Sequence, residues 1–349
     1  MAHDHDHHRH DHDHDHDEEC GCESGALLVE RPRRLRMRRV LREVVAETRL
    51  HRDMLVQPHF VLPGKGQREE IPSMPGILRE SADKLVETVK ADLKLGLRHV
   101  LLFGLPEGKS PAADGALDPD GVIPRAVRRL KQEFKDDLLV STDVCVCAYT
   151  DHGHCGVVRD GEVVNDESLE LIAGMALAHA EAGADLVCPS DMMDGRVMAI
   201  RQTLDEAGLV NVPIMSYAAK YASGYYGPFR EAADSAPAFG DRRSYQMDPR
   251  NAREAVREVQ LDVAEGADIV MVKPVLAYLD VIRRVRETVA LPVACYNVSG
   301  EYSMVKAAAR AGWVEEARVV RENLWGMARA GADIIITYHG REALREGWL

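Results

Sequence analysis

Three cysteines, Cys145, Cys147 and Cys155, lie within eleven residues of the chain. The strand-like run Leu138–Thr142 precedes the first two, and residues two apart on an extended strand point to the same side. A polar loop through Gly153 can return the third cysteine to the same point. Three thiolates leave one tetrahedral position of a zinc ion open, which is typical of a catalytic zinc site. The spacing therefore predicts a zinc enzyme.

The alternative is three ordinary cysteines at a buried strand end. His152 and His154 flank the last of them, and this density of metal-binding residue types favours the metal site. The other four of the seven cysteines do not suggest a disulfide framework, because two lie in a polar N-terminal segment and two stand singly in apolar runs. We therefore expect a reducing, cytoplasmic location.

Two lysines stand at the ends of apolar, strand-like runs. Lys273 closes Ile-Val-Met-Val-Lys-Pro, and Lys220 follows Met-Ser-Tyr-Ala-Ala. Burial and a neighbouring ammonium both disfavour the charged form of a lysine, and a neutral amine can attack a ketone to form a Schiff base. Either lysine alone would more simply be a solvated surface group. Two of them beside a zinc site favour catalysis, and other polar residues stand at predicted strand ends: Asp143, Asp191, Ser299 and Tyr338.

Residues 221–248 form a long stretch rich in Gly, Pro, Ser and Tyr. It is too long for an ordinary connection between a strand and a helix, so we predict an active-site lid. The stretch carries Arg230, Arg242 and Arg243, and a guanidinium binds carboxylate substrates through two parallel hydrogen bonds. The alternative is a surface loop with solvated arginines, which the two lysines make less attractive.

The elements that must position these residues alternate regularly. We predict eight apolar, β-branched strands, typical of a parallel sheet that is buried on both faces: Leu55–Leu62, His99–Phe103, Leu138–Thr142, Asp185–Pro189, Val212–Tyr217, Ile269–Lys273, Pro292–Asn297 and Asp333–Tyr338. Helical segments separate most of them, for example Ser81–Leu95, Asp166–Ala182, Ala252–Glu265 and Glu315–Ala330. This pattern predicts a (β/α)8 TIM barrel, whose catalytic groups stand at the C-terminal ends of the strands. A doubly wound open sheet is the alternative, but no Gly-x-Gly-x-x-Gly pattern follows any strand.

Length and composition fit one large barrel. The chain has 349 residues, of which 46% are hydrophobic and 5% aromatic, so aliphatic side chains must fill most of the core. The formal net charge of −13 makes nucleic acid an unfavoured partner. No apolar stretch is long enough to span a bilayer, and we expect no membrane association.

The N-terminal part divides into two segments. Residues 1–25 alternate His and Asp, have almost nothing apolar to bury, and are expected to be a disordered tail that either binds metal ions loosely or has no function. Residues 26–50 are expected to form an N-terminal arm, which leaves 51–349 for the catalytic barrel. The basic run Arg31–Arg42 suggests nucleic-acid binding, but it lacks aromatic stacking residues. Packing on an acidic neighbour, such as another subunit, is favoured instead.

Several motifs together resemble the porphobilinogen synthase (δ-aminolevulinic acid dehydratase) family, over the chain from about Arg31 to its end. The most specific are the segment Asp143–Gly156 with its three cysteines, Met215-Ser-Tyr-Ala-Ala-Lys-Tyr-Ala-Ser, Tyr226-Gly-Pro-Phe-Arg-Glu-Ala-Ala, Phe239-Gly-Asp-Arg-Arg-Ser-Tyr-Gln and Gly266-Ala-Asp-Ile-Val-Met-Val-Lys-Pro. Further matches are Arg68-Glu-Glu-Ile-Pro-Ser-Met-Pro-Gly and Tyr296-Asn-Val-Ser-Gly-Glu-Tyr. Agreement at so many separate strand ends is very unlikely to arise by chance.

The resemblance implies the condensation of two 5-aminolevulinate molecules to porphobilinogen with loss of two waters. It implies roles for ten residues at the site: Lys273 and Lys220 as Schiff-base lysines, Cys145, Cys147 and Cys155 as ligands of a catalytic zinc, Ser299 and Tyr338 as ligands of the first substrate's carboxylate, Arg230 and Arg242 as ligands of the second, and Asp143 as an aid to proton transfer. Zinc would polarise the ketone of the second substrate.

The resemblance also implies features outside the active site. Glu258 matches a glutamate near an allosteric magnesium, for which an exposed helical glutamate is the alternative. The family is typically a homo-octamer whose N-terminal arm wraps a neighbour. Val275 follows Lys273-Pro where the family usually has a small residue, which puts the local fit of that turn in doubt.

Two other functions remain as alternatives. A Schiff-base aldolase on the same barrel would explain one lysine, but neither the second lysine nor the cysteines. A metal-buffering or metal-delivery protein would use the His/Asp-rich segment as its working part. Deletion of residues 1–25 separates this last alternative from an enzyme, because a buffer would lose its function and a synthase would keep turnover.

Overall fold

A computed structural model describes residues 30–349 of the chain. The expected disordered tail, residues 1–25, lies outside the described residues. Residues 30–47 belong to one compact unit and residues 48–349 to another. In the first unit a 3-10 helix (Pro32–Arg36) precedes α1 (Arg39–Val44), and neither has a buried residue.

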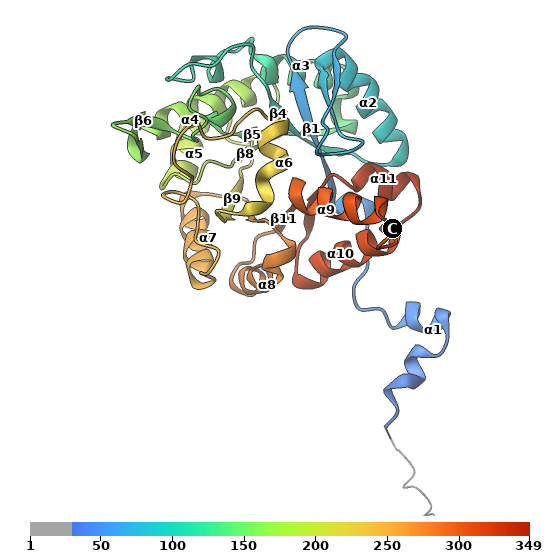
Figure 1. Ribbon diagram of the computed structural model, residues 1–349. Helices are drawn as coiled ribbons and strands as arrows, with labels where there is room; N and C mark the ends of the chain where they lie inside the picture. Colours follow the sequence, from blue (N-terminus) through green and yellow to red (C-terminus); the bar gives the residue numbers. More distant parts are fainter. Residues whose placement is uncertain (1–29) are drawn as a thin grey trace, which may run out of the picture. The chain divides into compact units, whose positions relative to one another are not determined.

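The second unit is a barrel of eight parallel strands, as predicted (Figure 1). The strands pair in the order β8-β5-β4-β1-β12-β11-β10-β9, and an isolated parallel bridge between Val187 and Ile214 links the two ends. Their bounds are β1 Leu55–Leu62, β4 His99–Gly104, β5 Leu139–Val144, β8 Leu186–Pro189, β9 Met215–Lys220, β10 Ile269–Lys273, β11 Val293–Asn297 and β12 Ile334–Thr337.

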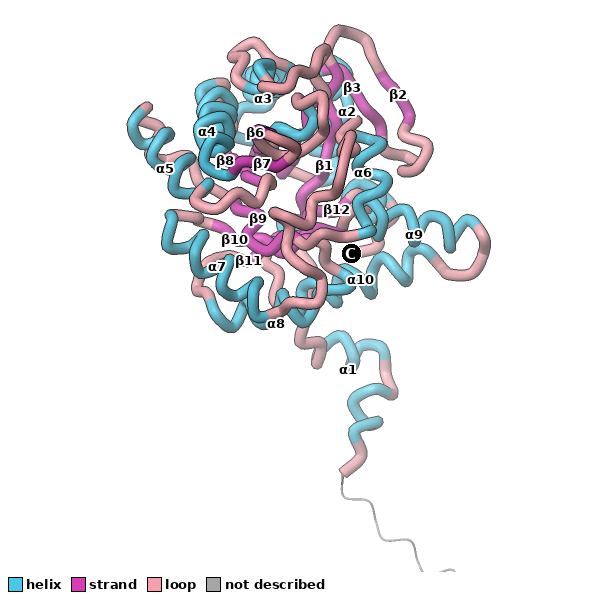
Figure 2. The backbone as a smooth tube through the Cα atoms, turned by 60° about the vertical axis from the view of Figure 1, so that its left-hand side comes forward, coloured by secondary structure: helices cyan, strands magenta, loops and turns pink. Residues whose placement is uncertain are grey.

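Helices surround this barrel (Figure 2). Their bounds are α2 Ala82–Leu95, α3 Val122–Phe134, α4 Asn165–Glu181, α5 Arg196–Glu206, α6 Gly227–Ala232, α7 Arg253–Glu265, α8 Leu279–Thr288, α9 Ser299–Arg310, α10 Glu316–Ala330 and α11 Gly340–Arg345. Two short hairpins decorate the loops: β2 Arg68–Glu70 with β3 Leu78–Ser81, and β6 Val157–Arg159 with β7 Glu162–Val164. The four helices predicted by residue range are confirmed to within a residue or two at each end.

Glycines end helices α7 and α10. Gly266 and Gly331 follow α7 and α10 with φ angles of 108° and 119°. This left-handed conformation is open to glycine at little cost and lets the helix end abruptly before the next strand.

Two apolar clusters hold the barrel together. The larger lies between strands and helices and is mostly aliphatic, as the composition predicted. The smaller fills the barrel interior and gathers many of the chain's few aromatic residues, among them Phe60, Phe103, Tyr217, Tyr296 and Tyr338. Along β12, Ile335 belongs to the outer cluster and Ile336 to the inner one, which is the two-residue alternation of a strand. The barrel interior is therefore richer in aromatic residues than the average composition suggested.

No helix in the described part of the chain is both long and apolar enough to cross a bilayer.

Candidate active site

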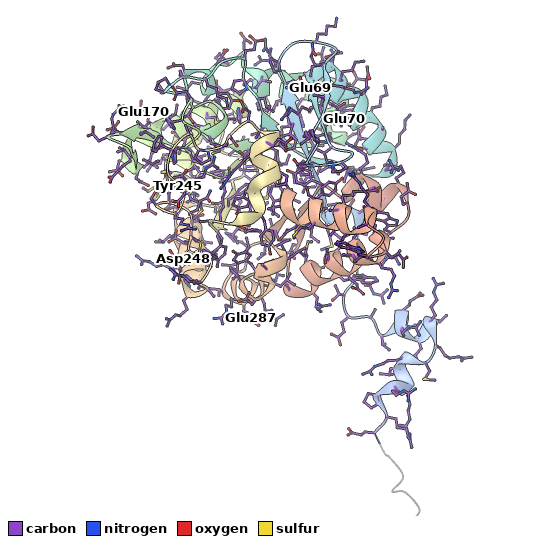
Figure 3. All side chains as sticks on the ribbon, viewed as in Figure 1. Glu69, Glu70, Glu170, Tyr245, Asp248 and Glu287 are labelled. Atoms are coloured by element: carbon purple, nitrogen blue, oxygen red, sulfur yellow. The ribbon has the colours of Figure 1, made fainter. Side chains whose placement is uncertain are left out.

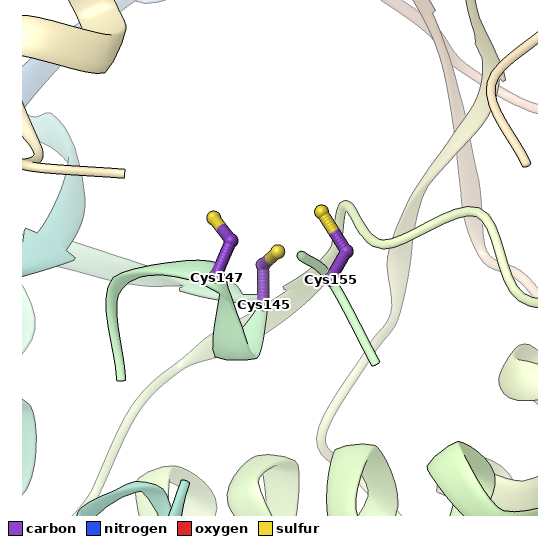
Figure 4. A group of neighbouring side chains, drawn as sticks. All are labelled: Cys145, Cys147 and Cys155. Carbon is purple, nitrogen blue, oxygen red and sulfur yellow. The ribbon is translucent and has the colours of Figure 1, made fainter. Parts of the chain in front are cut away.

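The three cysteines converge at the C-terminal end of β5. Their sulfur atoms all lie within 4.8 Å of one another, and the three side chains point the same way (Figure 4). All three residues are buried. Hydrogen bonds from the thiols of Cys145 and Cys155 hold the pKa of Cys147 well below the usual thiol value. The triple therefore favours at least one thiolate, which is the form that binds metal.

The route to this convergence differs from the predicted one. Strand β5 ends at Val144, and residues Val146–Ala148 form a 3-10 helix. Cys145 and Cys147 are thus brought together by a tight turn, and the expectation that an extended strand points both to the same side was wrong. The loop through Gly153 returns Cys155, as expected. The glycine is required there, because its φ is 68° and a Cβ would lie 2.3 Å from the carbonyl oxygen of Ala236.

The donor set fits zinc. Sulfur is a soft ligand and Zn–S bonds are about 2.3 Å long, so three sulfurs around one tetrahedral ion stand roughly 3.8 Å apart. The observed convergence needs only a small adjustment to reach that spacing. A fourth position remains for a substrate oxygen or water.

The two lysines lie side by side on neighbouring strands. Lys220 ends β9 and Lys273 ends β10, and the two are register partners in the parallel pair. Both lysines are 5% exposed, and the Nζ atoms of Lys220 and Lys273 lie 5.8 Å and 5.0 Å from the centre of the Tyr217 ring. Neither lysine is therefore a solvated surface group.

A β-bulge explains how Lys220 reaches this position. Ser216 pairs with Val270 and Ala219 pairs with Val272, so β9 has one residue more than β10 over this interval. An extra residue reverses the inward and outward alternation beyond it. Without the bulge, Tyr217 and Lys220 would point to opposite faces. The predicted strand Val212–Tyr217 ended inside this irregular interval, whereas the observed strand runs from Met215 to Lys220.

The surroundings of Lys273 favour a neutral amine. Its Nζ lies 4.1 Å from the centre of the Tyr296 ring and 5.2 Å from that of Phe229. Aromatic faces attract an ammonium, but burial and the nearby Lys220 outweigh that attraction and lower the pKa of Lys273 to about 7. A substantial fraction of this lysine is then a free amine near neutral pH.

Asp143 lies near both lysines and near the cysteines. It occupies the inner face near the end of β5, and burial raises its pKa to about 6, although Lys220 and Lys273 oppose that rise. Its Oδ1 atom has no hydrogen-bond partner among the described residues. The carboxyl group can therefore accept and return a proton close to neutral pH.

Tyr338 and Ser299 each form a hydrogen bond to a residue whose ring packs near Lys273. The hydroxyl groups of Tyr338 and Tyr296 are 3.0 Å apart, which links Tyr338 to the ring that covers Lys273. The Ser299 hydroxyl accepts a hydrogen bond of 2.9 Å from the backbone N–H of Phe229, a residue of α6. The Ser299 hydroxyl is thus close to the segment that covers the site.

The predicted lid segment covers the mouth and contains α6 (Figure 1). Arg230 lies on α6, half-buried, with no hydrogen-bond partner at Nε among residues 30–349. Arg242 is buried and donates hydrogen bonds of 2.8 Å and 2.6 Å to the carbonyl oxygens of Gly153 and Ser235. Arg243 instead is exposed and lies 3.5 Å from Asp241. The structure therefore brings two of the three lid arginines towards the site.

The same segment packs on the cysteine loop. The ring nitrogens of His154 lie 3.1 Å from the Tyr245 hydroxyl and 3.0 Å from the Phe239 carbonyl oxygen. The backbone N–H of Ala238 donates to the carbonyl oxygen of His152. Both histidines thus contribute to the contact between the two loops. Among the described residues, the group that could hold a metal ion here consists of the three cysteines and includes neither histidine.

Little space is left at the reacting groups. A cavity of about 20 Å³ lies beside Asp143, Cys145 and Cys147, and Phe229 and Ala233 of the lid segment close it. This volume is that of roughly one water molecule. The lid segment must therefore move before two organic substrates can enter.

Glu258 is not brought to the mouth. It lies on α7, half-buried, along a cavity of about 450 Å³ whose lining includes Asp194, Glu254 and Tyr245. Figure 3 labels Tyr245 and Asp248, on the segment that runs from the lid into α7. Burial and the nearby Asp194 raise the pKa of Glu258. It is not the exposed helical glutamate that the sequence left open as an alternative.

Two residues that contribute to the site, Tyr217 and Glu301, were not identified from the sequence. Tyr217 lies between the two lysines, and the β-bulge that places it there cannot be seen without the partner strand. Glu301 is buried and accepts backbone N–H bonds from Val275, Leu276 and Val298. A glutamate three residues into a helix commonly caps the helix start in this way. Its position three residues after Val298 could therefore have identified Glu301 from the sequence.

These bonds settle the doubt about Val275. Its side chain is fully buried in the outer apolar cluster, and its N–H donates to Glu301 over 3.2 Å. The turn after the cis peptide bond Lys273–Pro274 accommodates valine.

Comparisons with known proteins agree with this geometry. A family model described as "Delta-aminolevulinic acid dehydratase" matches residues 29–346. Proteins of that name from Synechococcus elongatus and Methanothermobacter thermautotrophicus are 54% and 56% identical to the chain, covering 91% and 90% of it and 98% and 96% of their own lengths. A crystal structure of delta-aminolevulinic acid dehydratase from Toxoplasma gondii, in complex with its product porphobilinogen, superposes with a TM-score of 0.89 at 45% identity and covers 91% of each chain.

Proposed function

The chain belongs to the delta-aminolevulinic acid dehydratase (porphobilinogen synthase) family, and we propose that it forms porphobilinogen from two molecules of 5-aminolevulinate through two lysine Schiff bases. The reaction releases two waters and makes the protein a hydro-lyase. The observation that carries the mechanism is the pairing of Lys220 with Lys273 beside the cysteine triple. One amine is available for each of the two ketones.

Lys273 is the more clearly activated nucleophile. Its pKa of about 7 leaves free amine at neutral pH, and that amine attacks the ketone carbon of the first substrate, whose oxygen leaves as water. Lys220 holds the second ketone in the same way. Covalent attachment of both substrates makes their condensation effectively intramolecular, which is worth roughly 7–11 kcal/mol of the barrier when the reacting atoms are well aligned.

Cys145, Cys147 and Cys155 would hold a zinc ion. When bound, zinc supplies Lewis acidity to the ketone of the second substrate. Asp143 lies next to these ligands, and with a pKa of about 6 it takes up and releases protons at the reacting carbons. The protein's own contribution is to keep this carboxyl buried near the two amines and the thiols.

The contacts to the substrates' carboxylates follow from the family resemblance. Ser299 and Tyr338, whose hydroxyl groups contact Phe229 and Tyr296 next to Lys273, donate hydrogen bonds to the carboxylate of the first substrate. Arg230 and Arg242 stand on the lid side and bind the carboxylate of the second through charge-assisted hydrogen bonds. These contacts would also draw residues 221–248 over the site once both substrates are present.

Three further features are proposed with the function. Glu258 contributes to a magnesium site outside the mouth. Among the described residues it is not part of a group of three converging metal-ligand residues. Few protein ligands suit magnesium, because this ion usually keeps several of its waters. The arm, with exposed Leu35, Met37 and Val40, contacts another subunit of a homo-oligomer, in the family's manner an octamer. The compartment is the cytoplasm, in keeping with free thiols at all five described cysteines.

The test is incubation of the zinc-loaded protein with 5-aminolevulinate, with pyrrole formation followed in the wild type and in two lysine variants. Lys273→Ala should reduce turnover by at least about 10³-fold, since it removes the nucleophile. Borohydride should no longer trap substrate at this position, whereas Lys220→Ala should still form the Lys273 adduct. Undiminished pyrrole formation by Lys273→Ala, or by protein stripped of zinc with a chelator, would refute this mechanism.

A further inference from the structure

A second group of metal-ligand types converges outside the active site. Glu316 begins α10, His339 follows β12, and Glu342 lies on α11. Each offers one ligand atom, and these atoms all lie within 4.8 Å of one another. This group and the cysteine triple are the two such groups in residues 30–349. A cluster of carboxylates alone is common on protein surfaces, so the case depends on the histidine.

The imidazole ring of His339 has no hydrogen-bond partner among residues 30–349. It is 2% exposed, and neither Nδ1 nor Nε2 has a partner among the described residues. A buried polar atom without a hydrogen-bond partner costs free energy. The ring therefore either faces a ligand or destabilises the fold. Burial and the nearby Lys306 lower its pKa to about 3. The ring is therefore the neutral imidazole, with a lone pair free to bind a cation.

Lys306 now supplies the positive charge between the two carboxylates. Its Nζ lies 2.5 Å from Oε1 of Glu316 and in contact with Oε2 of Glu342. One ammonium balances only one of the two negative charges. Arg345, which lies 3.8 Å from Glu342 with a half-exposed side chain, adds little to that balance.

The site is open to solvent from this side. The side chains of Lys306, Glu316 and Glu342 are 14%, 24% and 27% exposed. Lys306 has a flexible four-carbon stem, and its ammonium can swing outward without disturbing the helix. A hydrated ion can therefore reach the carboxylates and replace the ammonium.

We propose that Glu316, His339 and Glu342 form a second divalent-cation site, of the zinc class, whose occupant displaces the ammonium of Lys306. The imidazole selects zinc and similar transition metals over magnesium and calcium, which prefer oxygen ligands. Three protein ligands leave a position for water. The carboxylates of Glu316 and Glu342 are then balanced by the two positive charges of the ion instead of the single charge of Lys306. The ion also connects α10 and α11 to the end of β12, next to Tyr338.

The test is a zinc titration of the full-length enzyme after its cysteine site has been filled with zinc, followed by calorimetry. Wild type should bind one more zinc per chain than Glu342→Gln or His339→Phe. Lys306→Met should bind that zinc at least tenfold more tightly, because the competing ammonium is gone. Glu346→Gln, also on the last turn of the chain but outside the group, is the matched control and should behave as wild type. The His-rich N-terminal segment is common to all variants and cancels in the comparison.

Thermal unfolding gives a second readout that does not depend on activity. Without added zinc, Lys306→Met should melt below wild type, because Glu316 and Glu342 then face each other unpaired. Added zinc should raise its melting temperature by several degrees more than that of Glu342→Gln. A gain of this kind cannot come from misfolding. Equal zinc stoichiometry, affinity and thermal shift in wild type, Lys306→Met and Glu342→Gln would overturn the proposal.

Discussion

The amine of Lys273 is the best defined reactive group in the molecule. Four aromatic rings, those of Tyr217, Tyr226, Phe229 and Tyr296, have their centres 4.1 to 5.5 Å from its Nζ. They exclude water and would stabilise an ammonium, while the loss of solvation destabilises it more. Asp143 favours the charged amine and Lys220 disfavours it. The balance among these groups sets the pH at which the lysine reacts.

The pH dependence of Schiff-base formation at Lys273 should report this balance. The reactive form is the free amine, so the rate of borohydride-trapped adduct formation should rise through about pH 7 and fall about tenfold per pH unit below it. Asp143→Asn removes a charge that raises the pKa of Lys273, so the rise should move to lower pH. Lys220→Met removes a charge that lowers this pKa, so the rise should move to higher pH. Shifts of the same sign in both variants would contradict this electrostatic account.

At the scale of single elements, the strands and helices were predictable and the irregularities between them were not. The apolar runs and the helical segments between them located the barrel's elements from local pattern alone. The bulge that turns Lys220 inward depends on pairing with β10, and the turn that joins Cys145 and Cys147 depends on packing in three dimensions. The residue types and their spacing were therefore enough to identify the chemistry. The geometry of the reacting groups could be obtained only from the folded chain.

A buried ionic network joins β9, α5 and α7 below the lysines. Arg196 donates to both oxygens of Asp262 at 3.1 Å and 2.9 Å, and to the Ser216 hydroxyl of β9 at 3.0 Å. Its Nε also lies 4.0 Å from Asp191, which follows β8. The Lys220 ammonium donates to the carbonyl oxygen of the neighbouring Ser190. The network therefore ties β9, the strand that ends in Lys220, to α5 and α7.

Breaking this network should destabilise the barrel strongly. Arg196→Met leaves the carboxylate of Asp262 buried and unpaired, which costs about 3–5 kcal/mol. Arg283→Met removes an exposed pair with Glu287, whose side chains are 61% and 58% accessible, and should cost about 0.5 kcal/mol or less. Urea unfolding of the two variants beside wild type measures the difference. Comparable losses in both would mean that the Arg196 network contributes no more than a surface pair.

At the scale of the whole molecule, the barrel is one part of the proposed assembly. The arm's short helices bury none of their residues, and Leu35, Met37, Val40 and Val44 are between 51% and 71% exposed. Apolar side chains gathered on a basic segment are unfavourable in water, and contact with another subunit would remove that cost. Glu258 lies outside the mouth, so an ion bound there acts on the assembly or on the lid and not on the substrates directly.

Magnesium should therefore act through Glu258 without touching the chemistry. The cavity beside Glu258 also includes Tyr245 of the segment that packs on the cysteine loop, so an ion there can stabilise the closed lid as well as subunit contacts. In zinc-loaded wild type, added magnesium should raise turnover severalfold and increase the sedimentation coefficient. Glu258→Gln keeps the shape of the side chain but loses its charge, and should show neither response while retaining basal activity. Glu287→Gln, on the exposed face of α8, is the control and should respond as wild type does. If Glu258→Gln responded equally, magnesium would have to act at another site.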